Sequence, residues 1–139
     1  MRKLLVLPLL LVLLALTPKA FAAEELSTIP DVPVKGTATM VDLGADKCIP
    51  CKMMAPIIRK MQEVYKERAA IVFIDIWKHP EQGKKFNIGT MPTQIFYDKD
   101  GKEFYRHEGF LSEHGIRTVF EKVGIKASED SNPPEYGGS

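Results

Sequence analysis

The chain has 139 residues, of which 45% are hydrophobic and 27% charged, with two cysteines and a formal net charge of +1. This composition predicts one globular domain with a hydrophobic core and excludes collagen-like, low-complexity and disulfide-dense chains. The charge shows no basic excess, so we expect no nucleic-acid partner.

The N-terminal segment has the pattern of a secretory signal peptide over residues 1–22. Two basic residues precede an apolar run over residues 4–16, and Ala20 and Ala22 are the small residues that a signal peptidase recognises. The run is shorter than the ~20 helical residues that cross a bilayer. An uncleaved membrane anchor is the alternative. We expect cleavage near Ala22 and a periplasmic or otherwise exported protein, in a compartment where disulfides persist.

The remaining sequence predicts an extended lead-in over residues 23–36, a domain over residues 37–126 and a disordered tail over residues 127–139. A β-prone run predicts the first strand over residues 37–43. Apolar residues at helical spacing then predict a helix over residues 51–66. Pro56 lies inside this helix and should kink it.

The second half of the domain predicts a strand, a short helix, a hairpin and a last helix. An almost unbroken apolar run over residues 71–76 predicts a strand buried on both faces. Pro80 begins a short helix that reaches Phe86. Two β-prone runs, over residues 93–97 and 103–108, flank a turn ending in glycine and predict a hairpin.

Ser112 is the expected N-cap of the last helix, with Leu111 and Ile116 placed for a hydrophobic staple. The apolar stripe of this helix is expected to be Ile116, Val119, Phe120 and Val123. One parallel crossover followed by an antiparallel hairpin gives a mixed sheet with helices on its faces.

Two further side chains have simple structural interpretations. Trp77 follows the second strand and is expected to pack in the core or at its rim, rather than to serve as a substrate platform. His107 lies in the last strand and is expected to be a surface residue facing a neighbouring strand.

Both cysteines lie in the motif Cys48-Ile49-Pro50-Cys51, between a predicted strand and a predicted helix. A thiol at a helix N-terminus faces unpaired N–H groups and the positive end of the helix dipole, which favour the thiolate. We therefore predict that Cys48 is the attacking nucleophile and that Cys51, inside the first turn, is the buried resolving thiol. Such a dithiol can attack a disulfide, form a mixed disulfide and release it through the second thiol.

Three other interpretations of the cysteine pair remain open. A structural disulfide would close a very short loop and add little stability. A zinc site needs about four ligands, and the chain adds only three histidines to its two thiols. Copper handling would use the soft ligands Met53 and Met54, which are more simply explained as helix-surface and core residues. We expect no metal and no bound cofactor.

Beyond the cysteines, the sequence resembles the thioredoxin superfamily over about residues 39–124. Asp42 stands at the position of the family's buried acid, and Pro56 at the kink of its active-site helix. The segment Gly89-Thr90-Met91-Pro92-Thr93 resembles the loop that holds the family's cis-proline. The resemblance implies a thioredoxin fold, an α/β domain with a mixed central sheet flanked by helices, here with a shortened N-terminal portion.

The resemblance also implies a substrate-binding surface. Pro92 would be cis and lie beside the two sulfurs. Met91 would offer its backbone groups to an extended substrate peptide, as in β-strand addition. Ile49 and Pro50, between the cysteines, complete the expected substrate-binding set.

Asp42, by the same resemblance, would be a buried carboxyl with a raised pKa that relays a proton to or from Cys51. The sequence departs from the family pattern nearby. Lys47 and Gly44 stand at positions where the family usually carries aromatic residues. Phe73 stands where a lysine often pairs with the buried acid, so Asp42 is expected to be more weakly tuned.

Together these features predict an exported thiol–disulfide oxidoreductase that acts on protein substrates through Cys48 and Cys51. Reduction is favoured over oxidation, because Pro50 and the hydrophobic Met91 resemble thioredoxin-like reductants. A membrane thiol electron donor of the cytochrome c biogenesis type would fit, and we expect a monomer. The alternatives are a disulfide oxidase or isomerase, and a non-catalytic thioredoxin-fold module that binds a metal or a protein.

Overall fold

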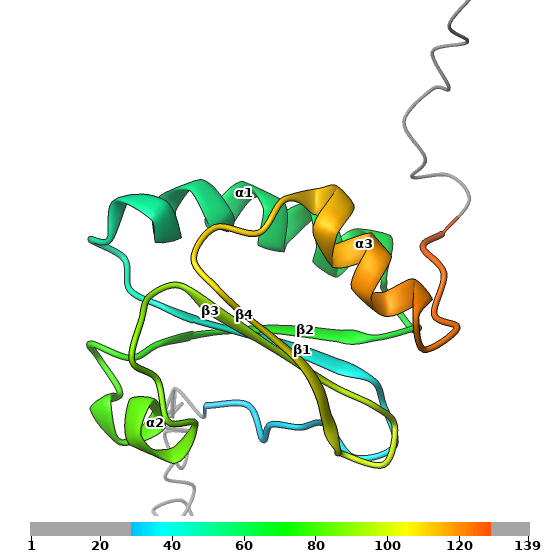
Figure 1. Cartoon of the computed structure of the whole chain (residues 1–139), viewed down its shortest axis with the longest axis horizontal. Helices are drawn as coiled ribbons and strands as arrows, with labels where there is room; N and C mark the ends of the chain where they lie inside the picture. Colours follow the sequence, from blue (N-terminus) through cyan, green and yellow to red (C-terminus); the bar gives the residue numbers. More distant parts are fainter. Residues whose placement is uncertain (1–28, 129–139) are drawn as a thin grey trace, which may run out of the picture.

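The computed structural model describes residues 29–128 (Figure 1). The predicted signal peptide, the first part of the lead-in and nearly all of the predicted tail lie outside these residues. In chain order the elements are β1 (Thr39–Gly44), α1 (Ile49–Val64), β2 (Ala70–Asp75), α2 (Pro80–Lys85), β3 (Thr93–Tyr97), β4 (Glu103–Glu108) and α3 (Glu113–Glu121).

Within the described part of the chain, the strands form one sheet in the order β2-β1-β3-β4. β1 pairs in parallel with β2, whereas the β1–β3 and β3–β4 pairs are antiparallel. Helices α1 and α3 cover one face of the sheet, and α2 lies on the other side (Figure 1). The mixed sheet with helices on its faces is therefore confirmed.

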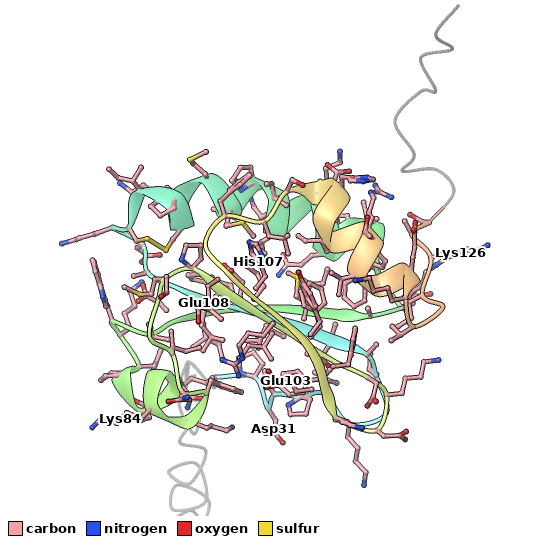
Figure 2. The ribbon with its side chains drawn as sticks, in the orientation of Figure 1. Asp31, Lys84, Glu103, His107, Glu108 and Lys126 are labelled. Atoms are coloured by element: carbon pink, nitrogen blue, oxygen red, sulfur yellow. A yellow bond between two sulfur atoms is a disulfide. The ribbon has the colours of Figure 1, made fainter. Side chains whose placement is uncertain are left out.

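The core lies on both faces of the sheet, because β1 is central and every one of its residues is buried. Under α1 and α3, Tyr65 and Phe96 pack against Phe120 with ring centroids 4.6 and 5.3 Å apart. On the opposite face, Val32 of the lead-in is buried against residues of β1 and β3. Labelled charged side chains such as Lys84 lie at the periphery (Figure 2).

The two hairpin strands have the predicted bounds, and the last helix is capped as expected. Ser112 Oγ accepts a hydrogen bond from the Gly115 N–H at 3.1 Å. Leu111 and Ile116 both lie in the core cluster under the helices, as a hydrophobic staple requires. Val123 lies beyond the end of α3 and is 38% exposed, so its expected place in the apolar stripe is wrong.

Two further expectations fail at the edge of the sheet. β2 is not buried on both faces, because among residues 29–128 it pairs only with β1 and so lies at the edge of the sheet, where Phe73 is 38% exposed. Trp77, expected to pack in the core or at its rim, is 57% exposed, because it lies in the turn that follows β2.

Candidate active site

The two cysteines form a disulfide at the N-terminus of α1, with their Cα atoms 5.2 Å apart. Cys48 is the N-cap residue, in an extended backbone conformation, and its Sγ accepts a hydrogen bond from the Cys51 N–H at 3.4 Å. Cys51 lies in the first turn and is 4% exposed, whereas Cys48 is partly exposed. These positions suit an accessible first sulfur and a buried second sulfur, as the motif predicts.

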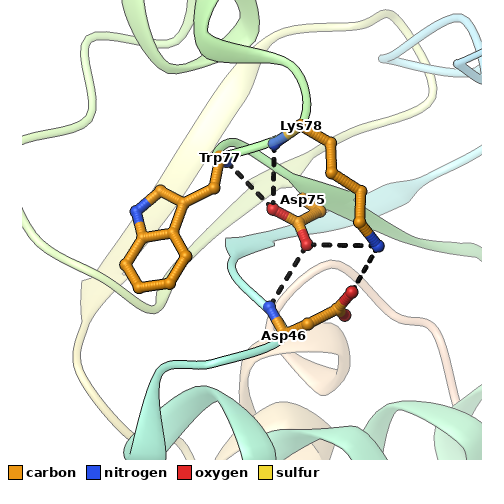
Figure 3. Close-up of polar contacts among 4 residues, drawn as sticks. All are labelled: Asp46, Asp75, Trp77 and Lys78. Atoms are coloured by element: carbon orange, nitrogen blue, oxygen red, sulfur yellow. Dashed lines mark hydrogen bonds and ion pairs between the residues drawn. The ribbon is translucent and has the colours of Figure 1, made fainter.

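The loop that carries Cys48 is fastened to the turn after β2 by one carboxylate. Asp75 accepts hydrogen bonds from the backbone N–H groups of Asp46 (3.2 Å), Trp77 (2.9 Å) and Lys78 (3.2 Å), as Figure 3 shows. The Lys78 ammonium also pairs with the Asp46 carboxylate and lies 3.6 Å from that of Asp75. Burial alone would raise the pKa of Asp75, but these donors hold the pKa below its ordinary value.

Asp42 lies in the middle of β1 and is 1% exposed. Its Oδ1 accepts a hydrogen bond from Gln94 Nε2 at 2.7 Å. Burial raises the pKa of Asp42 to about 6, and the hydrogen bond from Gln94 partly opposes that rise. Asp42 is therefore a buried carboxyl, as the resemblance implies, and its part in proton transfer stays a prediction.

A cavity of about 290 Å³ lies between α1 and the sheet, and both Asp42 and Cys51 line it. Its wall also includes Phe73, which is the Cα partner of Asp42 on β2. A Cβ atom on Gly44 would lie 3.1 Å from Cys51 Sγ and 3.4 Å from Phe73 Cε2. Glycine at this position therefore preserves the space between the buried sulfur and β2.

The loop before β3 contains a cis peptide bond between Met91 and Pro92, as the resemblance implies. Two hydrogen bonds of 2.7 Å hold the loop, one from the Gly109 N–H to the Pro92 carbonyl and one from the Thr93 hydroxyl to the Thr90 carbonyl. Thr93 is the Cα partner of Leu43 near the end of β1, which places Pro92 at the same end of the sheet as the cysteines.

Large hydrophobic side chains are exposed on the elements that carry the disulfide. Ile49 follows Cys48 and is 76% exposed, and Met53 is exposed one turn further along α1. Trp77 is exposed in the turn that Asp75 ties to the Cys48 loop. Sequence reasoning missed the exposure of Trp77 and the parts played by Asp75 and Gln94. For Asp75 and Gln94, the signal in the sequence is a polar residue inside an otherwise apolar strand.

The family model described as Thioredoxin matches residues 16–122, which is most of the chain. The chain belongs to the thioredoxin family. It is 32% identical to a thioredoxin of Staphylococcus saprophyticus over 89 residues, or 64% of this chain and 85% of that one. It is 42% identical to Thioredoxin Y2, chloroplastic, of Arabidopsis thaliana over 72 residues, or 52% of this chain and only 42% of that longer protein.

Among solved structures, the chain is similar to Fasciola hepatica thioredoxin, with 31% identity and a TM-score of 0.56. The match covers 63% of this chain and 82% of that one. Family membership and the Cys48–Cys51 pair make the protein a thiol–disulfide oxidoreductase, and family membership implies protein thiols or disulfides as substrates. The relatives and the pair support protein-disulfide reductase activity.

Within residues 29–128, no three or more His, Cys, Asp or Glu side chains are grouped so that they could hold a metal ion. The helices in the same range include none with the length and apolar character to cross a membrane.

Proposed function

We propose that this thioredoxin-family protein reduces disulfides in other exported proteins, in the periplasm and after removal of its signal peptide. The observation that carries thiol–disulfide exchange is the placement of the cysteines, whereas the reductive direction rests on the resemblance of Pro50 and Met91 to thioredoxin-like reductants. Cys48 Sγ sits at the N-cap of α1, where it accepts the Cys51 N–H and faces the positive end of the helix dipole. This environment stabilises a thiolate, which is the form that attacks a disulfide.

In the reduced protein, the Cys48 thiolate attacks one sulfur of a substrate disulfide. The substrate S–S bond breaks, the departing substrate sulfur takes a proton, and a mixed disulfide joins Cys48 to the substrate. Cys51 then gives its proton to the Asp42 carboxylate and attacks Cys48 Sγ. The mixed disulfide bond breaks, and the second substrate sulfur leaves as a thiolate that takes a proton from water. Two electrons have passed to the substrate, and the protein is left with the Cys48–Cys51 disulfide.

Substrate binding involves Met91, Pro92, Ile49 and Pro50. The backbone of Met91 would pair with an extended substrate segment, as a strand added beside the cis-proline loop. The exposed side chain of Ile49 lies directly beside Cys48 and would contact apolar side chains of that segment.

A reductase in an oxidising compartment must be reduced again after each cycle, because each turnover leaves the disulfide form. We propose that a membrane thiol protein of the cytochrome c biogenesis type supplies these electrons to a monomeric enzyme. The basic and apolar N-terminal segment, with Ala20 and Ala22, supports export. Mass spectrometry of the exported protein tests this point: a start near Ala23 supports cleavage, and an intact N-terminus indicates an anchor.

The direction of electron flow is tested by equilibrating the purified protein with glutathione buffers and measuring the Cys48–Cys51 potential. A value near −270 mV, as in thioredoxin, supports the reductase. A value near −120 mV, as in strong disulfide donors, would make the protein an oxidase. Failure to form the bond reversibly would leave a binding module with a structural disulfide.

A further inference from the structure

Asp42 belongs to a row of four residues that crosses the whole sheet. The Cα partners of Asp42 are Phe73 on β2 and Gln94 on β3, and Gln94 is in turn the partner of His107 on β4. Residues directly opposite one another in neighbouring strands share a face of the sheet. The buried carboxyl therefore has an aromatic ring on one side and an amide on the other.

Among residues 29–128, the amide of Gln94 is the only hydrogen-bond partner of the Asp42 carboxyl. Gln94 is fully buried, and its Nε2 lies 2.7 Å from Asp42 Oδ1. In the same part of the chain, Asp42 Oδ2 and Gln94 Oε1 have no hydrogen-bond partner. Buried polar atoms are costly to leave unpaired, so a glutamine kept in this core strand calls for a role that an apolar residue could not fill.

An amide suits a carboxyl that must change its protonation state. Its NH₂ group donates to an ionised carboxylate, and after a rotation its carbonyl oxygen accepts the O–H of a neutral carboxyl. The hydrogen bond to Oδ1 leaves Oδ2 without a partner among residues 29–128, and Asp42 and Cys51 line the same cavity. Phe73, on the other side of Asp42, offers no donor and no charge.

We propose that Gln94 is a positioning residue for thiol–disulfide exchange: its amide holds the Asp42 carboxyl in place and stabilises the ionised form against burial. The proposal rests on the proposed proton transfer between Asp42 and Cys51. The direction of the hydrogen bond supports it, because donation by Gln94 lowers the pKa of Asp42 while burial raises it.

Charged groups on the neighbouring elements are less favourably placed than Gln94 to stabilise the ionised Asp42 carboxyl. Asp46, Lys52 and Arg59 line the same cavity, but all three are exposed, and water weakens the effect of exposed charges. His107 follows Gln94 in the row and is partly buried on the edge strand (Figure 2). Its Nε2 lies 3.1 Å from the Phe110 carbonyl oxygen, so the ring donates away from Asp42.

The test replaces the amide and measures the pKa of the Asp42 carboxyl by carbon NMR in the reduced protein. Gln94→Met keeps the length of the side chain but removes the donor, and is expected to raise this pKa by about one unit or more. Gln62→Met is the matched control. Gln62 lines the same cavity but donates to the Ile71 carbonyl at 3.0 Å. The Gln62→Met variant should leave the Asp42 pKa unchanged.

A second variant keeps the test decisive if Gln94→Met does not fold. Gln94→Asn retains the amide but withdraws it by one methylene, and should raise the Asp42 pKa by a smaller amount. An unchanged Asp42 pKa in whichever folded variants are obtained would overturn the proposal. An equal shift in Gln62→Met would do the same, since it would indicate a general effect of repacking the cavity.

The pH dependence of mixed-disulfide release separates this inference from the proposed function. If both hold, the Gln94→Met profile moves with the Asp42 pKa, and Gln94→Met has no further effect in an Asp42→Asn background. If the pKa moves while the profile stays, Gln94 still stabilises the carboxylate, and it is the proton transfer through Asp42 that fails.

Discussion

The backbone N–H of Asp46 donates to the carboxylate of Asp75 across 29 positions of sequence, at 3.2 Å. This hydrogen bond joins the loop before Cys48 to the end of β2 (Figure 3). The same carboxylate orders the turn that carries the exposed Trp77. One buried aspartate therefore fixes two neighbouring parts of the active-site surface at once.

Replacing Asp75 by Asn should destabilise the fold, because a neutral amide oxygen is a weaker acceptor for three backbone N–H groups than a carboxylate. We expect a loss of about 1–3 kcal/mol in the free energy of unfolding at pH 7, measured by denaturant titration. Asp31→Asn is the control, since Asp31 is an exposed residue of the lead-in. Equal losses in the two variants would contradict the role given to Asp75.

The contribution of Asp75 should also depend on pH. Its pKa is lower in the folded protein than the ordinary value of 3.8, so the folded state binds this proton less tightly than the unfolded state. The stabilisation is then complete above pH 3.8 and is lost as pH falls through the folded pKa. The difference in unfolding free energy between the protein and Asp75→Asn should therefore shrink on acidification below pH 3.8.

Asp42 should show the opposite dependence, because burial raises its pKa from 3.8 to about 6. The folded state holds this proton more tightly, so the free energy of unfolding falls as pH rises from 3.8 to about 6. Above about pH 6 the full cost of ionising the buried carboxyl is present. Asp42→Asn should increase the free energy of unfolding by about 2–3 kcal/mol at pH 8 and by little below pH 4. Denaturant titrations at the two pH values measure both numbers, and a pH-independent difference would count against a buried carboxylate.

The sequence predicts local features of this fold better than its long-range pairings. The hairpin was predicted with its bounds because a turn ending in Gly101 fixes where both strands begin and end. The partial exposure of β2 is not predicted, because an apolar run in the sequence does not reveal which strand lies at the edge of the sheet. The exposure of Trp77 is not predicted for a related reason, since the position of its turn depends on the long-range hydrogen bond from the Asp46 N–H to Asp75 as well as on the local bond from its own N–H.

The site divides in the same way. The spacing of Cys48 and Cys51 predicts the redox pair directly, and the observed N-cap and buried positions follow from helix geometry. Asp42 was identified only through the family resemblance, because an aspartate in a strand has no local signature of burial. The contact between Gln94 and Asp42 could not be predicted, since it joins residues 52 positions apart through the register of β1 and β3.

The two cysteines should behave differently when each is replaced by serine. Cys51→Ser retains the attacking thiol but cannot release the substrate, so mixed disulfides with protein substrates should accumulate and be seen by non-reducing electrophoresis. Cys48→Ser should trap none, because Cys51 is buried. The reverse pattern would show that Cys51 is the nucleophile, and an absence of trapping in both variants would remove the exchange mechanism.

Trp77 should contribute to substrate binding rather than to the chemical step. It is the only tryptophan of the chain, and it is exposed in the turn that Asp75 ties to the Cys48 loop. Truncating an aromatic contact at an interface commonly costs about 1–2 kcal/mol, so Trp77→Ala should raise KM about five- to thirtyfold with little change in kcat. In the unaltered protein, its fluorescence should change when a peptide substrate binds.

Val123→Ala is the matched control for that experiment. Val123 is also an exposed hydrophobic residue, but it lines a different cavity together with Ala38, which precedes β1 and lies at the opposite end of the sheet from the cysteines. Its replacement should leave KM and kcat unchanged. A similar rise in KM for both variants would mean that general surface hydrophobicity, and not the position of Trp77, governs binding. A fall in kcat for Trp77→Ala with KM unchanged would instead assign the residue to the exchange step itself.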